Sequence, residues 1–526
     1  MELERIATNT YDFETIRKTG ITYVDKTGLM YPLVNTSMGN QFFLSRPRRF
    51  GKSLLLSTLQ KLFEGRRDLF QGLAIDSLPW DWSATYPVIR LDMSLCSGET
   101  VGEVEGRVVA TMRSEADRLG VALRNEDDAA ICLQSFIEDV AASGPCGQAV
   151  LLVDEYDKPL THWVGSEKVR PFQAFLKSFY AVIKKTESLQ RFCLMTGVSK
   201  FSKVSIFSDL NNLTDLTMNP AATTLLGYTH EEVRKNYPVR LASLADRLGV
   251  DVDGAFAQLV SMYDGYCFDE RMVRVFNPVS LGSALRDTQL KSYWFETGTP
   301  AWLMTYAKKT PMDMDSLTVG DADLGTFQPA DPSMPAVLLQ TGYLTIKGVW
   351  GQGMGTVYDL GFPNEEVSAG FNRWLANAYV RPDTDVSQTS GWAIACHRAV
   401  GSGDVSGFME ALESFFSAIG YDLADRLNEQ AYQCVVVAIM RFIGVYSEGE
   451  VRTSRGRIDI VLKAPGHTFV IEMKVASGEQ AGRKAAQAAL DQIREKEYAG
   501  SYRCSGTEVH LLGIAFDCLT HNVGAW

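Results

Sequence analysis

The stretch Gln41–Leu56, QFFLSRPRRFGKSLLL, restricts what this chain can fold into more than any other part of it. A short apolar strand is expected first, then a tight basic loop, then a helix that opens with Gly51-Lys52-Ser53. A helix N-terminus offers unpaired backbone N–H groups and the positive end of a dipole to an anion. The order strand, loop and helix therefore predicts a phosphate-binding loop. The alternative is a basic turn between core elements.

Two side chains of this loop have expected roles on a nucleotide. Lys52 can reach the β- and γ-phosphates, and the hydroxyl of Ser53 can ligate Mg²⁺. The first glycine of the usual pattern G-x-x-x-x-G-K-[ST] is replaced by Arg46, so that turn has to be made by a residue with a Cβ. The residues expected to contact the nucleotide are Arg48, Arg49, Phe50, Gly51, Lys52, Ser53 and Leu54.

A second group of polar residues ends the apolar run in Gln148–Leu160, QAVLLVDEYDKPL. Continuous apolar residues suit a central parallel strand that is covered on both faces. Carboxylates at the C-terminal end of such a strand face the crevice where these sheets bind ligands. We expect Asp154 to hold Mg²⁺ through water and Glu155 to polarise the attacking water. The alternative is that this pair caps the following helix.

Two further positions are candidates for contacts to the nucleotide. Thr196 follows the expected strand Phe192–Met195 and is the first candidate for sensing the γ-phosphate, with Ser199 second. Asp25, in the polar cluster YVDKT, is equally compatible with capping a helix and with touching the nucleotide.

The class of nucleotide chemistry follows from the order of the strands. Strands at Tyr86–Ser94 and Asn212–Thr217 complete a predicted five-strand core, and one strand lies between the phosphate loop and the Asp154-Glu155 strand. A glutamate beside the aspartate suits the activation of water. These features favour an ATPase that carries its own catalytic glutamate over a small GTPase or a small-molecule kinase.

The pattern changes beyond the predicted core. Residues 227–309 are expected to form a helical lid, which begins at a capping box of Thr229 and Glu232. Residues 310–365 are rich in turn-forming residues and predict a small β unit. The segment Arg381–Ser390, RPDTDVSQTS, is the expected linker.

The sequence VRTSRGRIDIVLKAPGHTFVIEMKV predicts a β-hairpin near the C-terminus. Because proline disfavours the two-residue primed turns, a four-residue loop Ala464–His467 is expected. This register places Asp459 directly opposite Glu472, with Cβ atoms roughly 5 Å apart. Two opposed carboxylates repel each other unless a cation lies between them. We therefore expect both to bind Mg²⁺, which takes carboxylate oxygens and keeps waters for chemistry.

Three more residues are expected at this second site. Lys474 shares a strand face with Glu472 and would orient or deprotonate the attacking water. Glu429, on the preceding helix, is a candidate outer metal ligand, and Gln492, on the following helix, could contact the same site. The alternative is a solvated hairpin face that carries three charged residues.

Composition limits the partners and the compartment. The net charge of −12 argues against a surface coated in basic residues, so any contact to nucleic acid needs a local patch. Nine cysteines without a C-x-x-C pattern fit reduced thiols in a cytoplasm. The N-terminus lacks a signal-peptide pattern and no apolar run has transmembrane length, so no membrane partner is expected.

These motifs resemble two known domains. YVDKT, RPRRFGKS, LLVDEYDKPL and TGVSKFSKVSIFSDLNNLTDLT are similar to the bacterial AAA-ATPase-like family, in which the Arg46 departure is part of the pattern. GRIDIVL, FVIEMK and ALDQI are similar to the PD-(D/E)XK nuclease superfamily.

The resemblance implies an α/β protein. Its expected parts are a P-loop NTPase core of the ASCE, AAA-like class with a parallel sheet, a helical lid, a small connector that contains a β unit, and a restriction-endonuclease-like α/β domain. The corresponding ranges are 1–226, 227–309, 310–390 and 391–526.

Two functions are compatible with these motifs. The first is an enzyme in which binding or hydrolysis of ATP gates a Mg²⁺-dependent nuclease, and two complete predicted sites motivate it. The second is a nucleotide switch without nuclease activity, whose C-terminal domain only binds nucleic acid or protein. The acidic net charge and the near charge balance of residues 450–526 favour the second. The sequence leaves the choice of DNA or RNA and the oligomeric state open, a homo-oligomer included.

Overall fold

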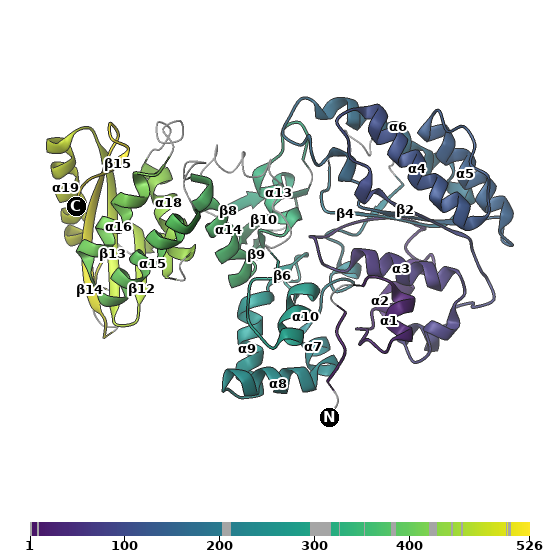
Figure 1. Cartoon of the computed structure of the whole chain (residues 1–526), viewed down its shortest axis with the longest axis horizontal. Coiled ribbons are helices and arrows are strands. Elements are labelled where there is room, and N and C mark those ends of the chain that lie inside the picture. Colours follow the sequence, from purple (N-terminus) through teal and green to yellow (C-terminus); the bar gives the residue numbers. More distant parts are fainter. Residues whose placement is uncertain are drawn as a thin grey trace. The chain divides into compact units, whose positions relative to one another are not determined.

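The computed structural model of the chain divides into two compact units. The first comprises Met1–Glu296 with Asp315–Glu365, and the second comprises Thr297–Met314 with Glu366–Trp526. Figure 1 colours the chain along its sequence, from purple at the start of the first unit to yellow at the end of the second. The residues that the structure describes are 3–7, 10–201, 212–294, 317–325, 327–351, 353–379, 386–419, 429–442, 445–453, 456–500, 502 and 506–526. The finer boundaries at residues 226, 309 and 390 stay predictions.

Among the described residues, a parallel sheet of five strands forms the centre of the first unit, in the order β2-β3-β4-β1-β5. Its strands are β1 (Gln41–Ser45), β2 (Val88–Asp92), β3 (Ala149–Asp154), β4 (Gln190–Gly197) and β5 (Thr214–Asp215). Every residue of β3 is buried, which agrees with its continuous apolar run. Because β4 lies between β1 and β3, the C-terminal ends of these three strands meet at one edge of the sheet.

Helices cover both faces of this sheet, as Figure 1 shows for α3 on one side and for α4 and α5 on the other. The helices are α1 (Phe13–Lys18), α2 (Thr27–Val34), α3 (Lys52–Phe63), α4 (Val101–Leu119), α5 (Ala129–Ser143) and α6 (Val169–Lys185). The ends of α4 follow from its sequence. The side chain of Thr100 accepts a hydrogen bond from the N–H of Glu103, and Gly120 ends the helix in the left-handed conformation. The predicted parallel core is confirmed.

A helical group follows the core and contains α7 (His230–Asn236), α8 (Pro238–Leu248), α9 (Val252–Tyr263) and α10 (Pro278–Asp287). The predicted capping box of Thr229 and Glu232 is present. A short antiparallel pair, β6 (Tyr266–Cys267) with β7 (Arg274–Val275), lies between α9 and α10. Val24, from the N-terminal segment, is part of the buried cluster of these helices. The helical group is therefore packed on the chain that leads into the core.

The predicted small β unit is also present in the first unit. It is the antiparallel sheet β8-β10-β9, with β8 (Leu317–Gly320), β9 (Thr345–Trp350) and β10 (Val357–Gly361), together with α12 (Asp321–Gly325) and α13 (Met334–Thr341). Gly342 ends α13 with a φ of 86°, so a glycine is required at this turn.

The second unit is a mixed sheet with helices on both faces. Figure 1 shows α19 on one side of the sheet and α15, α16 and α18 on the other. The helices are α14 (Glu365–Tyr379), α15 (Val386–Ser402), α16 (Val405–Phe416), α18 (Glu429–Phe442) and α19 (Glu479–Glu495). The strands, in their sheet order, are β11 (Tyr446–Thr453), β12 (Gly456–Ala464), β13 (His467–Ala476), β14 (Glu508–Asp517) and β15 (Asn522–Ala525). Only β13 and β14 pair in parallel among these described strands, and α19 connects them.

Two local expectations were wrong. Residues 386–390 of the predicted linker form the start of α15, and residues 381–385 lie outside the described part of the chain. Asp, Ser and Thr favour linkers, but they also favour the beginnings of helices. The hairpin between β12 and β13 has a loop of two residues, Pro465 and Gly466, because Ala464 and His467 are paired. Gly466 has a φ of 84°, the value that a type II turn with proline at its second position needs.

Among the helices of the described ranges, none combines the length and the apolar character needed to cross a membrane.

Candidate nucleotide and metal sites

The phosphate loop joins β1 to α3, and its left-handed residues are Arg49 and Gly51, with φ of 67° and 93°. Arg46, which occupies the position of the first glycine in the usual pattern, is therefore not in a left-handed conformation. Arg46 is 1% exposed, and its guanidinium donates hydrogen bonds to the carbonyls of Ser45, Thr217 and Ala222. It also lies over the ring of Phe268, 4.2 Å from the centroid. Arg46 thus anchors the loop to the segment that follows β5, which a glycine could not do.

The side chain of Lys52 folds back onto the phosphate loop. Its ammonium nitrogen donates hydrogen bonds to the carbonyl oxygens of Arg46 and Pro47, at 2.9 and 3.0 Å. The side chain is buried, and this burial lowers its pKa while the nearby carboxylate of Asp154 opposes the shift. A phosphate would offer the ammonium a charged partner in place of two neutral carbonyls. The geometry fits the role predicted for Lys52.

The carboxylate predicted to hold Mg²⁺ lies at the end of β3, next to the end of β4. Asp154 is 3% exposed, and its Oδ1 accepts hydrogen bonds from the hydroxyl of Thr196 at 2.9 Å and from the N–H of Glu155 at 3.1 Å. Neither bond uses Oδ2. Ser53 is the second residue of α3, the helix that begins at the phosphate loop. Asp154 and Ser53 offer oxygen atoms of the type that Mg²⁺ prefers, so the residues present fit this ion.

Glu155 has a φ of 50°, a left-handed conformation that a residue with a side chain seldom adopts. Backbone strain of this kind concentrates at functional sites. Burial raises the pKa of Glu155, and the charge of Asp157 raises it further, while Lys52 opposes the shift. The short helix η4 (Lys158–Leu160) receives no side-chain cap, so the alternative role of the Asp154 and Glu155 pair as helix caps is not supported.

Asp157 contributes to this edge of the sheet and was missed by sequence reasoning. Its carboxylate accepts hydrogen bonds from the N–H groups of Ser199, at 2.8 Å, and of Val198, at 3.4 Å. The loop after β4 is thereby tied to the loop after β3. A Cβ on Gly197 would come within 2.5 Å of the Tyr156 ring. Two features of the sequence could have indicated this contact. They are the aspartate three residues after Asp154 and the glycine that follows Thr196.

Asp25 lies just before α2 and makes its hydrogen bonds within the protein. Its Oδ1 accepts from the N–H and the hydroxyl of Thr27, and its Oδ2 accepts from the N–H of Ala74 at 2.7 Å. Both oxygens are thus used within the protein, although the N-cap position of α2 is Lys26, which makes no side-chain cap. These contacts favour a structural role of Asp25 beside the start of α2 over a contact to the nucleotide. The neighbouring Lys26 is paired with Glu232 at 2.7 Å, which joins this segment to α7.

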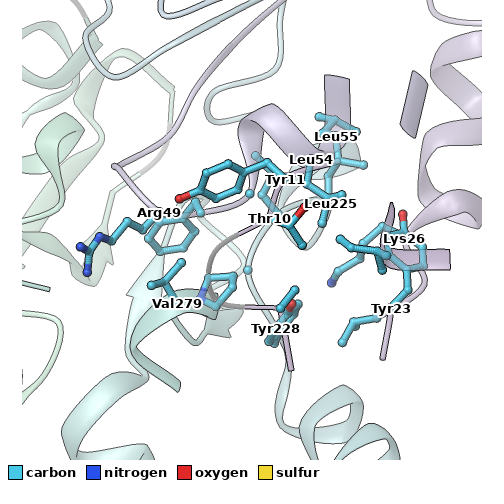
Figure 2. A pocket seen from close by; sticks show the side chains of 18 of the residues that line it. Thr10, Tyr11, Tyr23, Lys26, Arg49, Leu54, Leu55, Leu225, Tyr228 and Val279 are labelled. Carbon is cyan, nitrogen blue, oxygen red and sulfur yellow. The ribbon is translucent and has the colours of Figure 1, made fainter. Parts of the chain in front are cut away.

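A cavity that is open to solvent lies beside the start of α3. Its lining includes Tyr11, Tyr23, Lys26, Leu54, Leu225 and Tyr228, and Figure 2 shows these side chains around it. Three parts of the chain form the wall of this cavity: the N-terminal segment, the phosphate loop and the beginning of the helical group.

Only some of the loop residues that were predicted to contact the nucleotide line this cavity. Phe50, Gly51 and Leu54 line it. Arg49 also borders it, but its guanidinium donates to the carbonyl of Tyr293 at 2.6 Å and points away from the other labelled side chains in Figure 2. Arg48 is exposed and is not part of the wall.

The second predicted site lies on the hairpin of the second unit. Ile460 pairs with Ile471 and Val461 with Val470, which is the expected register despite the shorter loop. The carboxylate of Asp459 accepts a hydrogen bond from the N–H of Met473 at 2.8 Å. Asp459 therefore lies next to Glu472, as predicted.

Glu472 is a buried carboxylate with an unused oxygen. It is 2% exposed, its Oε1 accepts a hydrogen bond from the side-chain amide of Gln492, and no described residue donates to its buried Oε2. Burial, and then the charge of Asp459, raise the pKa of Glu472 to about 7. An unpartnered buried oxygen beside a second carboxylate is costly unless a cation is bound. The residues therefore fit a divalent metal.

Lys474 and Glu429 are close to this carboxylate. The ammonium nitrogen of Lys474 lies 3.6 Å from Glu472 Oε1 and 3.5 Å from Glu429 Oε1. Burial lowers the pKa of Lys474, but the carboxylates of Glu429, Glu472 and Asp459 outweigh it and raise the value. Gln433, which the sequence did not single out, donates to the carbonyl of Asp459 at 2.6 Å. All five predicted residues of the hairpin site are thus gathered by two strands and two helices, and the solvated-face alternative is not supported for Glu472.

Comparisons with known proteins agree with both predicted domains. Residues 7–207 match the family described as predicted AAA-ATPase, and residues 427–526 match the PD-(D/E)XK nuclease superfamily. The chain is 35% identical over 503 residues to an uncharacterised protein in the vnfD 5′ region of Azotobacter chroococcum mcd 1, and the match covers 94% of this chain and 92% of that protein. The chain belongs to the predicted AAA-ATPase family and carries a PD-(D/E)XK nuclease superfamily domain at its C-terminal end.

Proposed function

We propose that this protein hydrolyses ATP and that its nucleotide state controls a metal-dependent nuclease in the C-terminal domain. The observation that carries the nuclease part is the buried Glu472, whose Oε2 has no described donor and whose neighbours are Asp459 and Lys474. A purely structural carboxylate would be expected to have both oxygens satisfied.

In the first domain, the phosphates of ATP would bind at the N-terminus of α3, where Lys52 would exchange its two carbonyl partners for phosphate oxygens. Ser53 and Asp154 would hold Mg²⁺, which neutralises phosphate charge. Glu155 would accept the proton of the attacking water, and its raised pKa makes it a better base than an ordinary glutamate. The hydroxyl of Thr196 would report the γ-phosphate to Asp154.

The cavity beside Gly51 is the place for the base and ribose of ATP. It continues from the phosphate loop, and its lining is mostly apolar and aromatic, as sites for small ligands usually are. Tyr11 and Tyr228 supply aromatic surface, while Leu54 and Leu225 supply apolar contacts.

In the second domain, Asp459 and Glu472 would hold Mg²⁺ or Mn²⁺, with Glu429 as an outer ligand. The metal supplies Lewis acidity toward a phosphodiester. Lys474, positioned between Glu472 and Glu429, would orient the attacking water, and Gln492 would hold the Glu472 carboxylate in place. The substrate would be DNA or RNA.

Contacts within the first unit support the proposed control. Gln340, at the end of α13, accepts a hydrogen bond at 2.6 Å from the N–H of Lys200, four residues beyond Thr196. Thr345, at the start of β9, exchanges hydrogen bonds with the backbone of Cys267 in the β6 strand. The small β unit is thus attached both to the γ-phosphate side and to the helical group, and it directly precedes the chain of the second unit. Binding of ATP can act on the nuclease if it changes these contacts.

The experiment compares cleavage of a panel of DNA and RNA by the Glu155→Gln variant with ATP, with ADP and without nucleotide, in Mg²⁺ or Mn²⁺. Typical allosteric coupling of about 1–3 kcal/mol predicts rates that differ by roughly 5- to 150-fold between states. Equal rates with proven ATP binding would refute nucleotide control. No cleavage in any state by a folded protein would favour the regulator without nuclease activity, which the net charge of −12 also favours.

A further inference from the structure

The second unit carries another group of metal-binding side chains, distant from Glu472. His467 is the first residue of β13, and Glu508 and His510 begin the neighbouring parallel strand β14. Glu472 lies five positions after His467 along β13, which corresponds to roughly 17 Å of extended strand. The proposed catalytic metal therefore cannot share this group.

The three side chains converge on one point. His467 Nδ1 lies 3.1 Å from His510 Nε2 and 3.5 Å from Glu508 Oε2, and the remaining distance, from His510 Nε2 to Glu508 Oε2, is 4.0 Å. A point equidistant from three atoms with these separations lies about 2.1 Å from each of them, which is the bond length of Zn²⁺ to imidazole nitrogen and carboxylate oxygen. A hydrogen bond between two neutral imidazoles accounts for the shortest separation but not for the position of the carboxylate.

Packing holds the two imidazoles in this orientation. The ring of His510 stacks on Phe469 with centroids 4.6 Å apart. Gly403, between α15 and α16, lies so close that a Cβ there would come within 2.6 Å of the His467 ring and 3.1 Å of the His510 ring. The side chains of His467 and His510 are 20% and 13% exposed, whereas that of Glu508 is 68% exposed. Two ligands are thus preorganised, and the exposed side leaves room for a water as a fourth ligand.

We propose that His467, His510 and Glu508 bind Zn²⁺. Two imidazoles and one carboxylate suit this borderline ion better than Mg²⁺, which prefers oxygen ligands. A metal held by both strands would pin the start of β13 to the start of β14, and so stabilise the parallel pair on which Glu472 and Lys474 also lie. This inference does not depend on the proposed nuclease activity.

The test is a titration of the chelator-treated full chain with Zn²⁺, in a Cys146→Ser/Cys518→Ser background that removes the two thiols that are exposed among the described residues. With millimolar Mg²⁺ present throughout to occupy the oxygen ligands at Asp459 and Glu472, we expect one Zn²⁺ site by calorimetry and a higher melting temperature with Zn²⁺. Glu508→Gln keeps both half-buried rings and should weaken binding at least about tenfold, because loss of even an outer partner of a metal ligand costs about 10–100-fold. His467→Asn should abolish binding, and His397→Ala, on the exposed face of α15, should leave it unchanged.

Co²⁺ provides a second readout, since its visible absorption distinguishes four- or five-coordination with nitrogen ligands from the hydrated ion. Loss of this absorption in a folded His467→Asn variant would support the site. Zn²⁺ binding that survives both Glu508→Gln and His467→Asn but disappears in Glu472→Gln would overturn the assignment. So would the absence of Zn²⁺ binding at micromolar concentration.

Discussion

Replacing Glu472 by Gln removes the charge of a carboxylate that is only 2% exposed. Burial first, and the charge of Asp459 second, raise its pKa from 4.5 to about 7. In the unfolded chain the group ionises near its ordinary value, so between about pH 4.5 and 7 the folded protein binds more protons than the unfolded one. The stability of the metal-free second unit should therefore fall as the pH rises through this window, and should become level above it.

The magnitude follows from the size of the shift. A change of about 2.5 in pKa corresponds to about 3 kcal/mol at a pH above both values. The Gln variant keeps the shape of the side chain and does not ionise, so it avoids this cost. Without metal it should be more stable than the wild type by up to about 3 kcal/mol at pH 8, and nearly equal to it at pH 4.5.

The assay is hydrogen exchange of the β12 and β13 amides in a urea series, with chelator present and with intrinsic exchange rates corrected for pH. Exchange resolves the second unit even if the two units unfold separately. Glu495→Gln, an exposed change at the end of α19, is the matched control and should keep the wild-type slope with pH. Addition of Mg²⁺ should stabilise the wild type and not the Glu472→Gln variant. A variant that is less stable than the wild type at pH 8, or that keeps the same slope, would refute the reasoning.

Four further changes test the sites. Lys52→Ala should abolish ATP hydrolysis and weaken triphosphate binding, because it removes the loop ammonium; unchanged turnover would contradict the assignment. Glu155→Gln should bind ATP yet hydrolyse it at least about 100-fold more slowly, in nucleotide-binding and phosphate-release assays, and failure to bind would make the residue structural. Gly197→Ala should lower the melting temperature, since its Cβ would collide with the Tyr156 ring, and an unchanged melting curve would argue against that packing. Asp459→Ala should abolish metal-dependent cleavage while the circular dichroism spectrum stays unchanged. Cleavage at the wild-type rate would exclude Asp459 as a metal ligand.

Local patterns in the sequence were sufficient for the elements that carry the sites. The strand, loop and helix around Lys52 depend on neighbouring residues, as does the buried strand that ends in Asp154. The pairing of Ile460 with Ile471 was predictable as well, because it depends on the period of two along the strands and on the centre of the turn. The shorter loop did not alter this register, since both loops have the same centre.

Contacts between distant parts of the chain could not be predicted in this way. Arg46 was visible only as a missing glycine, and its role depends on carbonyls of Thr217 and Ala222, more than 170 residues away along the chain. Asp25 was compatible with two roles until Ala74 was seen to occupy its second oxygen. The hydrogen bonds of Asp157 likewise join loops that are separated by a helix and a strand.

The tertiary structure also decided the chemistry of Glu472. The sequence predicted its strand face and its carboxylate neighbour, because both follow from the alternation of side chains along a hairpin. Its raised pKa and its unpartnered oxygen depend on how far α18 and α19 exclude water from the sheet. The cost of removing a charge from water is set by the whole surrounding volume, which only the packed fold defines.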